Sequence, residues 1–174
     1  MKYLIKNEKD LEKLAENVLI LATEKKYNHA TVLALQGELG AGKTTFTKSL
    51  ARILGITDSV TSPTFVIQKT FSINSANSEN DDKNLVTENK ALAKAFSNNS
   101  FAQLIHIDSY RLDLSAELAH LGWHDLLNQK ENLIVVEWPE RIADILPMQY
   151  ILLKFTHVDE TTREVEVVVV DDKK

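Results

Sequence analysis

The chain contains no cysteine, and only three prolines and five glycines in 174 residues. Without cysteine it cannot form a disulfide, a cysteine-ligated zinc site or a thiol nucleophile. Arginine is also scarce, and its positions are scattered: Arg52, Arg111, Arg141 and Arg163. The formal net charge is −5 and the isoelectric point is near 5.5. This charge balance gives no indication of direct nucleic-acid binding.

Long apolar runs are absent as well. Residues 1–10 lack the apolar core of a signal peptide, and no apolar run approaches the roughly 20 residues that a membrane span needs. We therefore expect a cytoplasmic protein without membrane contact. The length suits a single domain over residues 1–174, because a chain of this size can bury a substantial core.

One long stretch, residues 72–100, is poor in apolar side chains and rich in asparagine and serine. Such a composition buries too little apolar surface to offset the entropy of ordering. We expect a polar insertion whose first half is mobile, with a short helix over 85–96, and we assign it no chemistry.

The most informative segment is Gly37–Thr44, which reads Gly-Glu-Leu-Gly-Ala-Gly-Lys-Thr. This is the complete pattern of a nucleotide phosphate-binding loop. It follows the apolar run 31–35, which predicts a buried strand, and it opens an amphipathic helix over 43–54 that Gly55 ends. A strand, a glycine-rich turn and a helix in this order predict a site for ATP or GTP.

The chemistry expected of this loop follows from its residue types. Backbone N–H groups of Gly40, Gly42 and Lys43 can converge on phosphate oxygens at a helix N-terminus, where the helix dipole also favours an anion. The Lys43 ammonium would reach the β- and γ-phosphates, and the Thr44 hydroxyl would bind Mg²⁺.

The rest of the chain alternates strand and helix patterns. The expected elements are a strand at 3–5, a helix over 8–26 capped by Asn7, an antiparallel pair of 65–71 with 102–107, a helix over 115–127 interrupted by Gly122, a buried parallel strand at 133–137, and a hairpin of 150–155 with 163–170. This order predicts an α/β fold, a P-loop NTPase-like three-layer sandwich with a mixed, partly parallel sheet.

Phosphoryl chemistry on a Mg²⁺-nucleotide needs a carboxylate at the end of a neighbouring strand. Asp108 and Glu137 both qualify, and either could bind the metal while the other orients the attacking water. We interpret His106 as a packed core histidine that faces away from Asp108. Trp138 is either a core residue or an exposed anchor for a partner.

Three classes of nucleotide-binding protein can be compared. A GTPase is excluded because Asn89-Lys90 is not followed by the guanine-reading aspartate, and no glycine lies three residues after Asp108. A small-molecule P-loop kinase, the alternative that we retain, would clamp its phosphates with several arginines. A binding switch with negligible turnover is the third class. The pattern favours an ATPase, with Thr61 or Thr64 placed to sense the γ-phosphate.

Five segments in this order resemble the successive motifs of the bacterial tRNA threonylcarbamoyladenosine biosynthesis ATPases, the TsaE family. They are Gly37–Thr45, Thr61–Phe65, His106–Leu112, the helix from Glu117 to Gly122, and Val136–Glu140. The resemblance covers most of the chain and is more specific than the phosphate loop alone. The sequence departs from the family at 72–100, which is longer than the usual connection.

The resemblance implies a Mg²⁺-dependent ATPase that binds ATP and ADP. It also implies as partners the TsaB and TsaD proteins, the heterodimer that transfers a threonylcarbamoyl group to adenosine 37 of tRNAs reading ANN codons. Contact with tRNA would be indirect, and ATP hydrolysis would support multiple turnover.

The family's functional residues map onto matching positions of this chain. The implied nucleotide-binding residues are Glu8, Gly40, Ala41, Gly42, Lys43, Thr44 and Thr45. Lys43, Asp108 and Glu137 would be catalytic. Thr44 and Glu137 would contact Mg²⁺, with Asp108 as the second acidic position.

Overall fold

The structure is a computed structural model that describes residues 1–73, 92 and 101–171. Seven strands form one sheet in the order β1-β7-β6-β2-β5-β4-β3. The strands are β1 (Lys2–Ile5), β2 (Thr31–Gly37), β3 (Gln68–Ser72), β4 (Gln103–Asp108), β5 (Asn132–Glu137), β6 (Tyr150–His157) and β7 (Arg163–Val170). The helices are α1 (Glu8–Glu24), α2 (Lys43–Ile53), α5 (Ser115–His120), α6 (Trp123–Asn128) and the 3₁₀ helix η1 (Pro139–Ile142).

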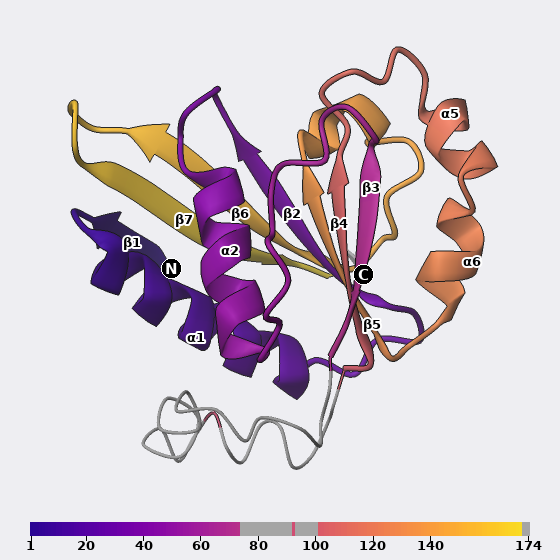
Figure 1. Ribbon diagram of the computed structural model, residues 1–174, viewed down its shortest axis with the longest axis horizontal. Coiled ribbons are helices and arrows are strands. Elements are labelled where there is room, and N and C mark those ends of the chain that lie inside the picture. Colours follow the sequence, from indigo (N-terminus) through magenta and orange to yellow (C-terminus); the bar gives the residue numbers. More distant parts are fainter. Residues whose placement is uncertain (74–91, 93–100, 172–174) are drawn as a thin grey trace.

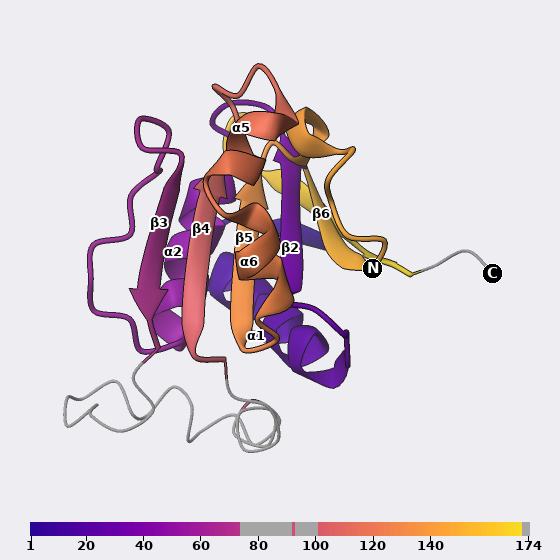
Figure 2. The same ribbon diagram turned by 90° about the vertical axis from the view of Figure 1, so that its right-hand side faces the viewer.

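The four central strands β6, β2, β5 and β4 run parallel. The outer strands β3, β7 and β1 each pair antiparallel with their neighbours, and Figure 2 shows β3 pointing opposite to β4 and β5. The prediction of a mixed sheet is therefore confirmed. Because the four parallel strands point the same way, their carboxyl ends meet at one edge of the sheet, which is where ligands bind in folds of this kind.

Helices cover both faces of the sheet, as Figures 1 and 2 show: α1 and α2 lie on one face, and α5 and α6 on the other. Successive side chains of a strand point to opposite faces. In β5, Leu133 and Val135 join the core under α1 and α2, whereas Ile134 and Val136 join the core on the α5 and α6 side. This arrangement confirms the three-layer sandwich.

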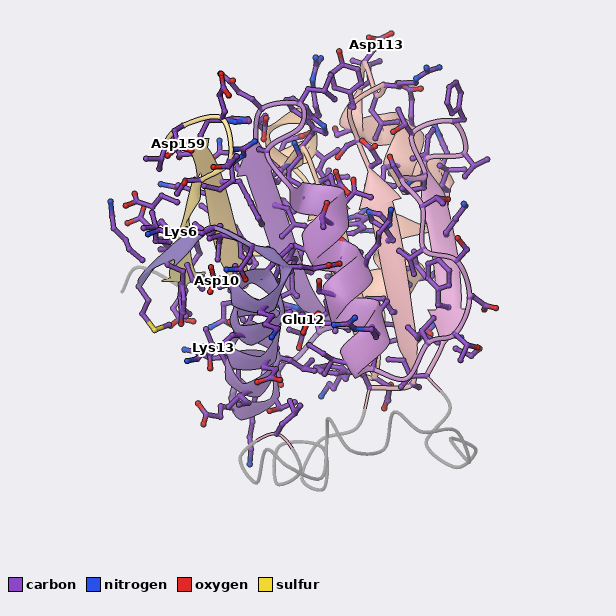
Figure 3. The ribbon with its side chains drawn as sticks, turned by 60° about the vertical axis from the view of Figure 1, so that its left-hand side comes forward. Lys6, Asp10, Glu12, Lys13, Asp113 and Asp159 are labelled. Carbon is purple, nitrogen blue, oxygen red and sulfur yellow. The ribbon has the colours of Figure 1, made fainter. Side chains whose placement is uncertain are left out.

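Polar contacts fix the start of α1 and join it to α2. Asn7 caps α1, its side-chain oxygen accepting a hydrogen bond from the Asp10 N–H at 3.1 Å. The Asp10 carboxylate in turn accepts from the Lys6 N–H at 3.0 Å. Glu12 of α1 pairs with Arg52 of α2, and Figure 3 shows Glu12 on the side of α1 that faces α2.

Element boundaries agree with the sequence in most places. The helix expected over 115–127 is divided by Gly122, whose φ of 89° is left-handed. The strand expected from residue 65 starts only at Gln68, because the chain turns before it and Ile67 has a φ of 66°.

The helix expected within the insertion falls outside the described residues, except for Leu92, which is buried in the core under α1 and α2. No helix among the described residues is both long and apolar enough to cross a membrane.

Candidate phosphate-binding site

The loop between β2 and α2 depends on three glycines for two different reasons. A Cβ on Gly37 would lie 2.7 Å from the Phe155 carbonyl oxygen of β6, so this position requires close backbone approach. Gly40 and Gly42 have φ values of 74° and 102°, which L side chains rarely adopt. A Cβ at these two positions would meet no atom within 4 Å, so the space above the loop is open.

The N-terminus of α2 faces this open space. Gly42 occupies the N-cap and supplies no side-chain cap, and the first turn carries no acidic residue. The N–H groups of the first turn therefore remain available, and the helix dipole adds partial positive charge there. The loop and the helix end together have the features that suit an anion.

The Lys43 side chain folds back over this loop. Its ammonium donates hydrogen bonds to the carbonyl oxygens of Gly37 at 2.6 Å and Glu38 at 2.9 Å, and it lies 4.1 Å from the centre of the Trp138 ring. Burial lowers the pKa of Lys43, and the negative charge of Glu137 is the largest opposing influence. The ammonium is thus held close to where phosphate oxygens would bind.

Glu137 and Asp108 end neighbouring strands and are paired in register. Both residues are 3 % exposed. The Glu137 Oε1 atom accepts a hydrogen bond from the Thr44 hydroxyl at 2.8 Å and lies 2.9 Å from Nε2 of His106. The first helical turn of α2 is therefore connected directly to the end of β5.

Asp108 is held by the loop that precedes β3. Its Oδ2 atom accepts hydrogen bonds from the hydroxyls of Ser62, at 2.8 Å, and Thr64. Its Oδ1 atom accepts from the Tyr110 N–H at 3.1 Å, and its own N–H donates to the Ile67 carbonyl at 2.9 Å. Asp108 therefore couples the end of β4 to residues 62–67.

The interpretation of His106 was partly wrong. The ring is fully buried, as expected, but it does not face away from Asp108. Residues two apart on a strand point to the same face, and Leu104, two residues earlier, lies in the core under α2. His106 therefore lies on the loop side of the sheet, where it meets Glu137.

The structure also separates the two threonines that were proposed as sensors. The Thr64 hydroxyl reaches Asp108, whereas the Thr61 hydroxyl accepts a hydrogen bond from Lys69 at 2.8 Å. Trp138 is half-buried and packs against Tyr110, with 5.0 Å between ring centres. Trp138 is therefore not a fully buried core residue, and contact of its exposed part with a partner stays a prediction.

Two pockets lie on either side of the phosphate loop. One, of about 380 Å³, is lined by Leu39, Gly40, Ala41, Gly42, Lys43, Thr44, Thr45, Ser62, Thr64, Asp108, Tyr110, Glu137 and Trp138. The other, of about 310 Å³, is lined by Ile5, Lys6, Asn7, Glu8, Leu11, Gly40, Ala41, Gly42, Thr45, Phe155, Thr161, Arg163 and Val165. In Figure 3, Lys6 lies at the start of α1, below the β6–β7 turn that carries Asp159.

Each nucleotide-binding, catalytic or metal residue implied by the family resemblance lines one of these two pockets, whereas Thr61 lines neither. Lys43, Thr44, Asp108 and Glu137 share the first, and Glu8 lies in the second. Sequence reasoning assigned no role to Ser62 and did not foresee the contact of His106. Both residues lie inside the quoted motifs, and for His106 the available signal was its place two residues before Asp108 on the same strand.

The donor set can be tested for its fit to Mg²⁺. The described residues contain no group of three or more histidine, cysteine, aspartate or glutamate side chains that could hold a metal ion. Thr44, Glu137 and Asp108 do offer oxygen atoms around one pocket. Mg²⁺ prefers oxygen ligands and usually keeps several waters, with one or two carboxylates and the nucleotide phosphates completing the site. The residues present fit that pattern.

Known proteins resemble this chain over most of its length. The family model described as "Threonylcarbamoyl adenosine biosynthesis protein TsaE" matches residues 5–81 and 90–165. Proteins named tRNA threonylcarbamoyladenosine biosynthesis protein TsaE are similar to the chain. The one from Haemophilus influenzae is 29% identical over 90% of this chain and 79% of its own length. The one from Aquifex aeolicus is 31% identical over 94% and 92%.

A third protein of that name, from Bacillus subtilis, is 32% identical over 77% of this chain and 66% of its own length. Among solved structures, the crystal structure of Bacillus subtilis YdiB superposes with a TM-score of 0.66 at 26% identity, covering 98% of this chain and 85% of that one.

Proposed function

The chain belongs to the TsaE family, and from this premise we propose that it is a Mg²⁺-dependent ATPase of tRNA threonylcarbamoyladenosine biosynthesis. One observation carries the proposal. The phosphate loop places Lys43 and Thr44 in the same pocket as Asp108 and Glu137. A phosphate cradle, a cation and two buried carboxylates are the parts that ATP hydrolysis needs.

We propose that the loop residues Gly40 to Thr45 bind the nucleotide phosphates through their N–H groups. Lys43 would exchange its two carbonyl partners for phosphate oxygens, because a charged acceptor makes the stronger hydrogen bond. The nucleoside would lie in the second pocket, beside Glu8. This placement follows from the loop residues that both pockets share.

We assign the metal side of the site to Thr44 and Glu137, with Asp108 acting through water. When bound, Mg²⁺ supplies positive charge that stabilises the charge developing on the transferred phosphoryl group. Thr44 already donates to Glu137 at 2.8 Å, so both oxygens point to one place. Asp108 has hydrogen bonds to both of its carboxylate oxygens, which suits it to orienting the attacking water rather than to direct metal contact.

Family membership makes the chain a protein of threonylcarbamoyladenosine biosynthesis, a pathway that implies a partner complex. We propose the TsaB–TsaD heterodimer as that complex, with ATP hydrolysis supporting its turnover and tRNA reached only through it. The cytoplasm, where tRNA is modified, is the proposed location.

The test is phosphate release from ATP, measured with the protein alone, with a TsaB–TsaD heterodimer, and with both heterodimer and tRNA. We expect Mg²⁺-dependent phosphate release that the heterodimer increases. Release without a phosphate acceptor distinguishes an ATPase from a kinase. A protein that releases no phosphate under all three conditions contradicts the proposal.

A further inference from the structure

His106 lies on the face of β4 that is turned toward α2 and the phosphate loop, and it is completely buried. Its Nε2 atom is 2.9 Å from Oε1 of Glu137. An ionised carboxylate can only accept a hydrogen bond, so Nε2 carries the proton and donates. Among the residues that the structure describes, none pairs with Nδ1 of His106, so no acceptor favours a proton on that nitrogen.

Packing alone does not account for a histidine at this position. Leu104, two residues earlier on the same face, is apolar and completely buried, as expected for a residue that only fills the core. A buried imidazole with one unpaired nitrogen carries a desolvation penalty that an apolar side chain avoids. Within the described ranges, the hydrogen bond that offsets this penalty goes to the Glu137 carboxylate.

The two oxygens of Glu137 have different surroundings. Oε1 is the atom that accepts from both Thr44 and His106. Within the described part of the chain, no hydrogen bond reaches Oε2. Fixing Oε1 from two directions sets the plane of the carboxylate and leaves Oε2 available to a ligand in the pocket.

Ser109, which directly follows β4, also holds the backbone of Glu137. The Ser109 hydroxyl donates to the Glu137 carbonyl at 2.7 Å, and the Ser109 N–H donates to the same oxygen at 3.1 Å. Two residues of the β4 segment on either side of Asp108 thus fix Glu137 at its backbone and at its carboxylate.

From this geometry we propose that His106 is a positioning residue, which orients the Glu137 carboxylate for the Mg²⁺ that accompanies the nucleotide. The inference rests on the proposed function. Partners that orient a metal-binding carboxylate typically change metal affinity by roughly 10- to 100-fold when they are removed. His106 should therefore affect Mg²⁺-dependent nucleotide binding and leave binding without metal intact.

Two substitutions separate the hydrogen bond from the packing. The amide nitrogen of His106→Gln can replace Nε2 as a donor, whereas the shorter His106→Asn places its amide near the Nδ1 position and loses the contact. ADP affinity is measured by calorimetry in Mg²⁺ and in EDTA. For His106→Asn, the gain in affinity from Mg²⁺ should fall by about 10-fold or more, while the affinity in EDTA stays unchanged.

His106→Gln should keep most of the Mg²⁺-dependent gain. The exposed His124 of α6 provides the matched control, and His124→Asn should behave as the wild type. Equal losses in His106→Gln and His106→Asn, or an equal loss in EDTA, would show a packing role and overturn the inference. If the wild type itself gains no affinity from Mg²⁺, the proposed metal site fails and the inference fails with it.

A measurement without metal covers the case in which His106→Asn does not fold. Long-range ¹H–¹⁵N NMR of the histidine rings in the wild type reports which nitrogen of His106 is protonated. We expect the Nε2–H tautomer, and a change of its Nε2 signal in Glu137→Gln. A proton on Nδ1 in its place, or an unchanged Nε2 signal in Glu137→Gln, would overturn the inference.

Discussion

Two sides of the phosphate pocket each present one carboxylate, equally buried and paired in register, yet held by different parts of the chain. On one side, Glu137 contacts the helix that follows the phosphate loop, through Thr44. On the other, Asp108 contacts residues 62–67 of the loop before β3, through Ser62 and Thr64. Similar burial therefore does not mean similar chemistry.

The difference lies in which oxygens remain available. Both carboxylate oxygens of Asp108 accept hydrogen bonds. In Glu137, by contrast, the hydrogen bonds from Thr44 and His106 both reach the same oxygen, Oε1. A carboxylate with a free oxygen can bind a cation directly, and one with both oxygens occupied is better suited to hold a water or a loop. Substitutions on the two sides of the pocket should therefore have different effects.

The largest expected effect is on the Glu137 side, at Lys43. Lys43→Ala removes an ammonium that would make charge-assisted hydrogen bonds to phosphate. Two such bonds contribute about 1.5 to 3 kcal/mol each, so ATP affinity should fall by at least about 100-fold. Calorimetric titration with ATP measures it. Lys48→Ala, at an exposed position of the same helix, should have no effect, and a folded Lys43→Ala protein with normal affinity would contradict the site.

Asp108→Asn should chiefly slow hydrolysis. Loss of a group that orients or deprotonates the attacking water typically lowers the rate by about 10²- to 10⁴-fold, while ATP affinity should change little. Single-turnover hydrolysis at saturating ATP, alongside nucleotide titration, separates the two quantities. A large loss of Mg²⁺-dependent ATP affinity in this variant would indicate that the metal binds to Asp108, at the end of β4.

Glu137→Gln keeps the size of the side chain and removes its charge. Mg²⁺-dependent ATP affinity should fall by roughly 10-fold or more, because a neutral amide oxygen is a weaker ligand for a hard dication. Affinity in EDTA should stay the same. If Glu137→Gln keeps its Mg²⁺ response and Asp108→Asn loses it, the two roles are exchanged.

Thr64→Val tests the contact between Asp108 and its loop. The variant removes one hydroxyl donor from a buried carboxylate, so the free energy of unfolding should fall by about 1.5 to 3 kcal/mol. Hydrolysis should fall less than in Asp108→Asn, because Ser62 still donates to Asp108 at 2.8 Å. Denaturant unfolding and phosphate release provide the two readouts.

Thr61→Val is the matched control for Thr64→Val, since the Thr61 hydroxyl contacts Lys69 on the surface instead. Equal effects of the two substitutions would show that the Asp108 contact has no special role.

Trp138→Ala should have a smaller effect on nucleotide binding. The ring contacts the Lys43 ammonium and Tyr110, and a cation–π contact contributes about 0.5 to 2 kcal/mol. Stimulation of turnover by the TsaB–TsaD heterodimer should fall more than ADP affinity. Partner-stimulated phosphate release and ADP affinity are measured on the same protein preparation. Equal losses in the two quantities would indicate that the ring only supports the fold.

The smallest effect is expected from deleting residues 75–84, a polar segment to which the sequence assigns no chemistry. Their polar composition predicts little buried area, and shortening a loop changes its closure entropy only modestly. Hydrolysis should therefore be unchanged. A large loss of activity in a folded deletion variant would assign this segment a role that its composition does not suggest.

Much of the site could be predicted because the relevant signals are local. A strand, the Gly37–Thr44 loop and the following helix are contiguous in the chain, so their order alone predicts the phosphate cradle. Asp108 and Glu137 could be singled out because each ends an apolar strand. The face on which His106 lies was predictable as well, because residues two apart on a strand point to the same side. The sequence-based interpretation nevertheless placed it on the wrong face.

Periodicity and glycine positions act over a few residues, so the main helices and strands, the three-layer α/β class and the phosphate loop could be predicted from the sequence. The structure was needed to establish that β6 lies beside β2 in parallel, that Glu8 lines a second pocket, and that Ser62 and Thr64 reach Asp108 rather than the surface. These contacts join segments far apart in the chain. Their pairing depends on how whole helices and strands pack around the two cores, and no short stretch of residues encodes that packing.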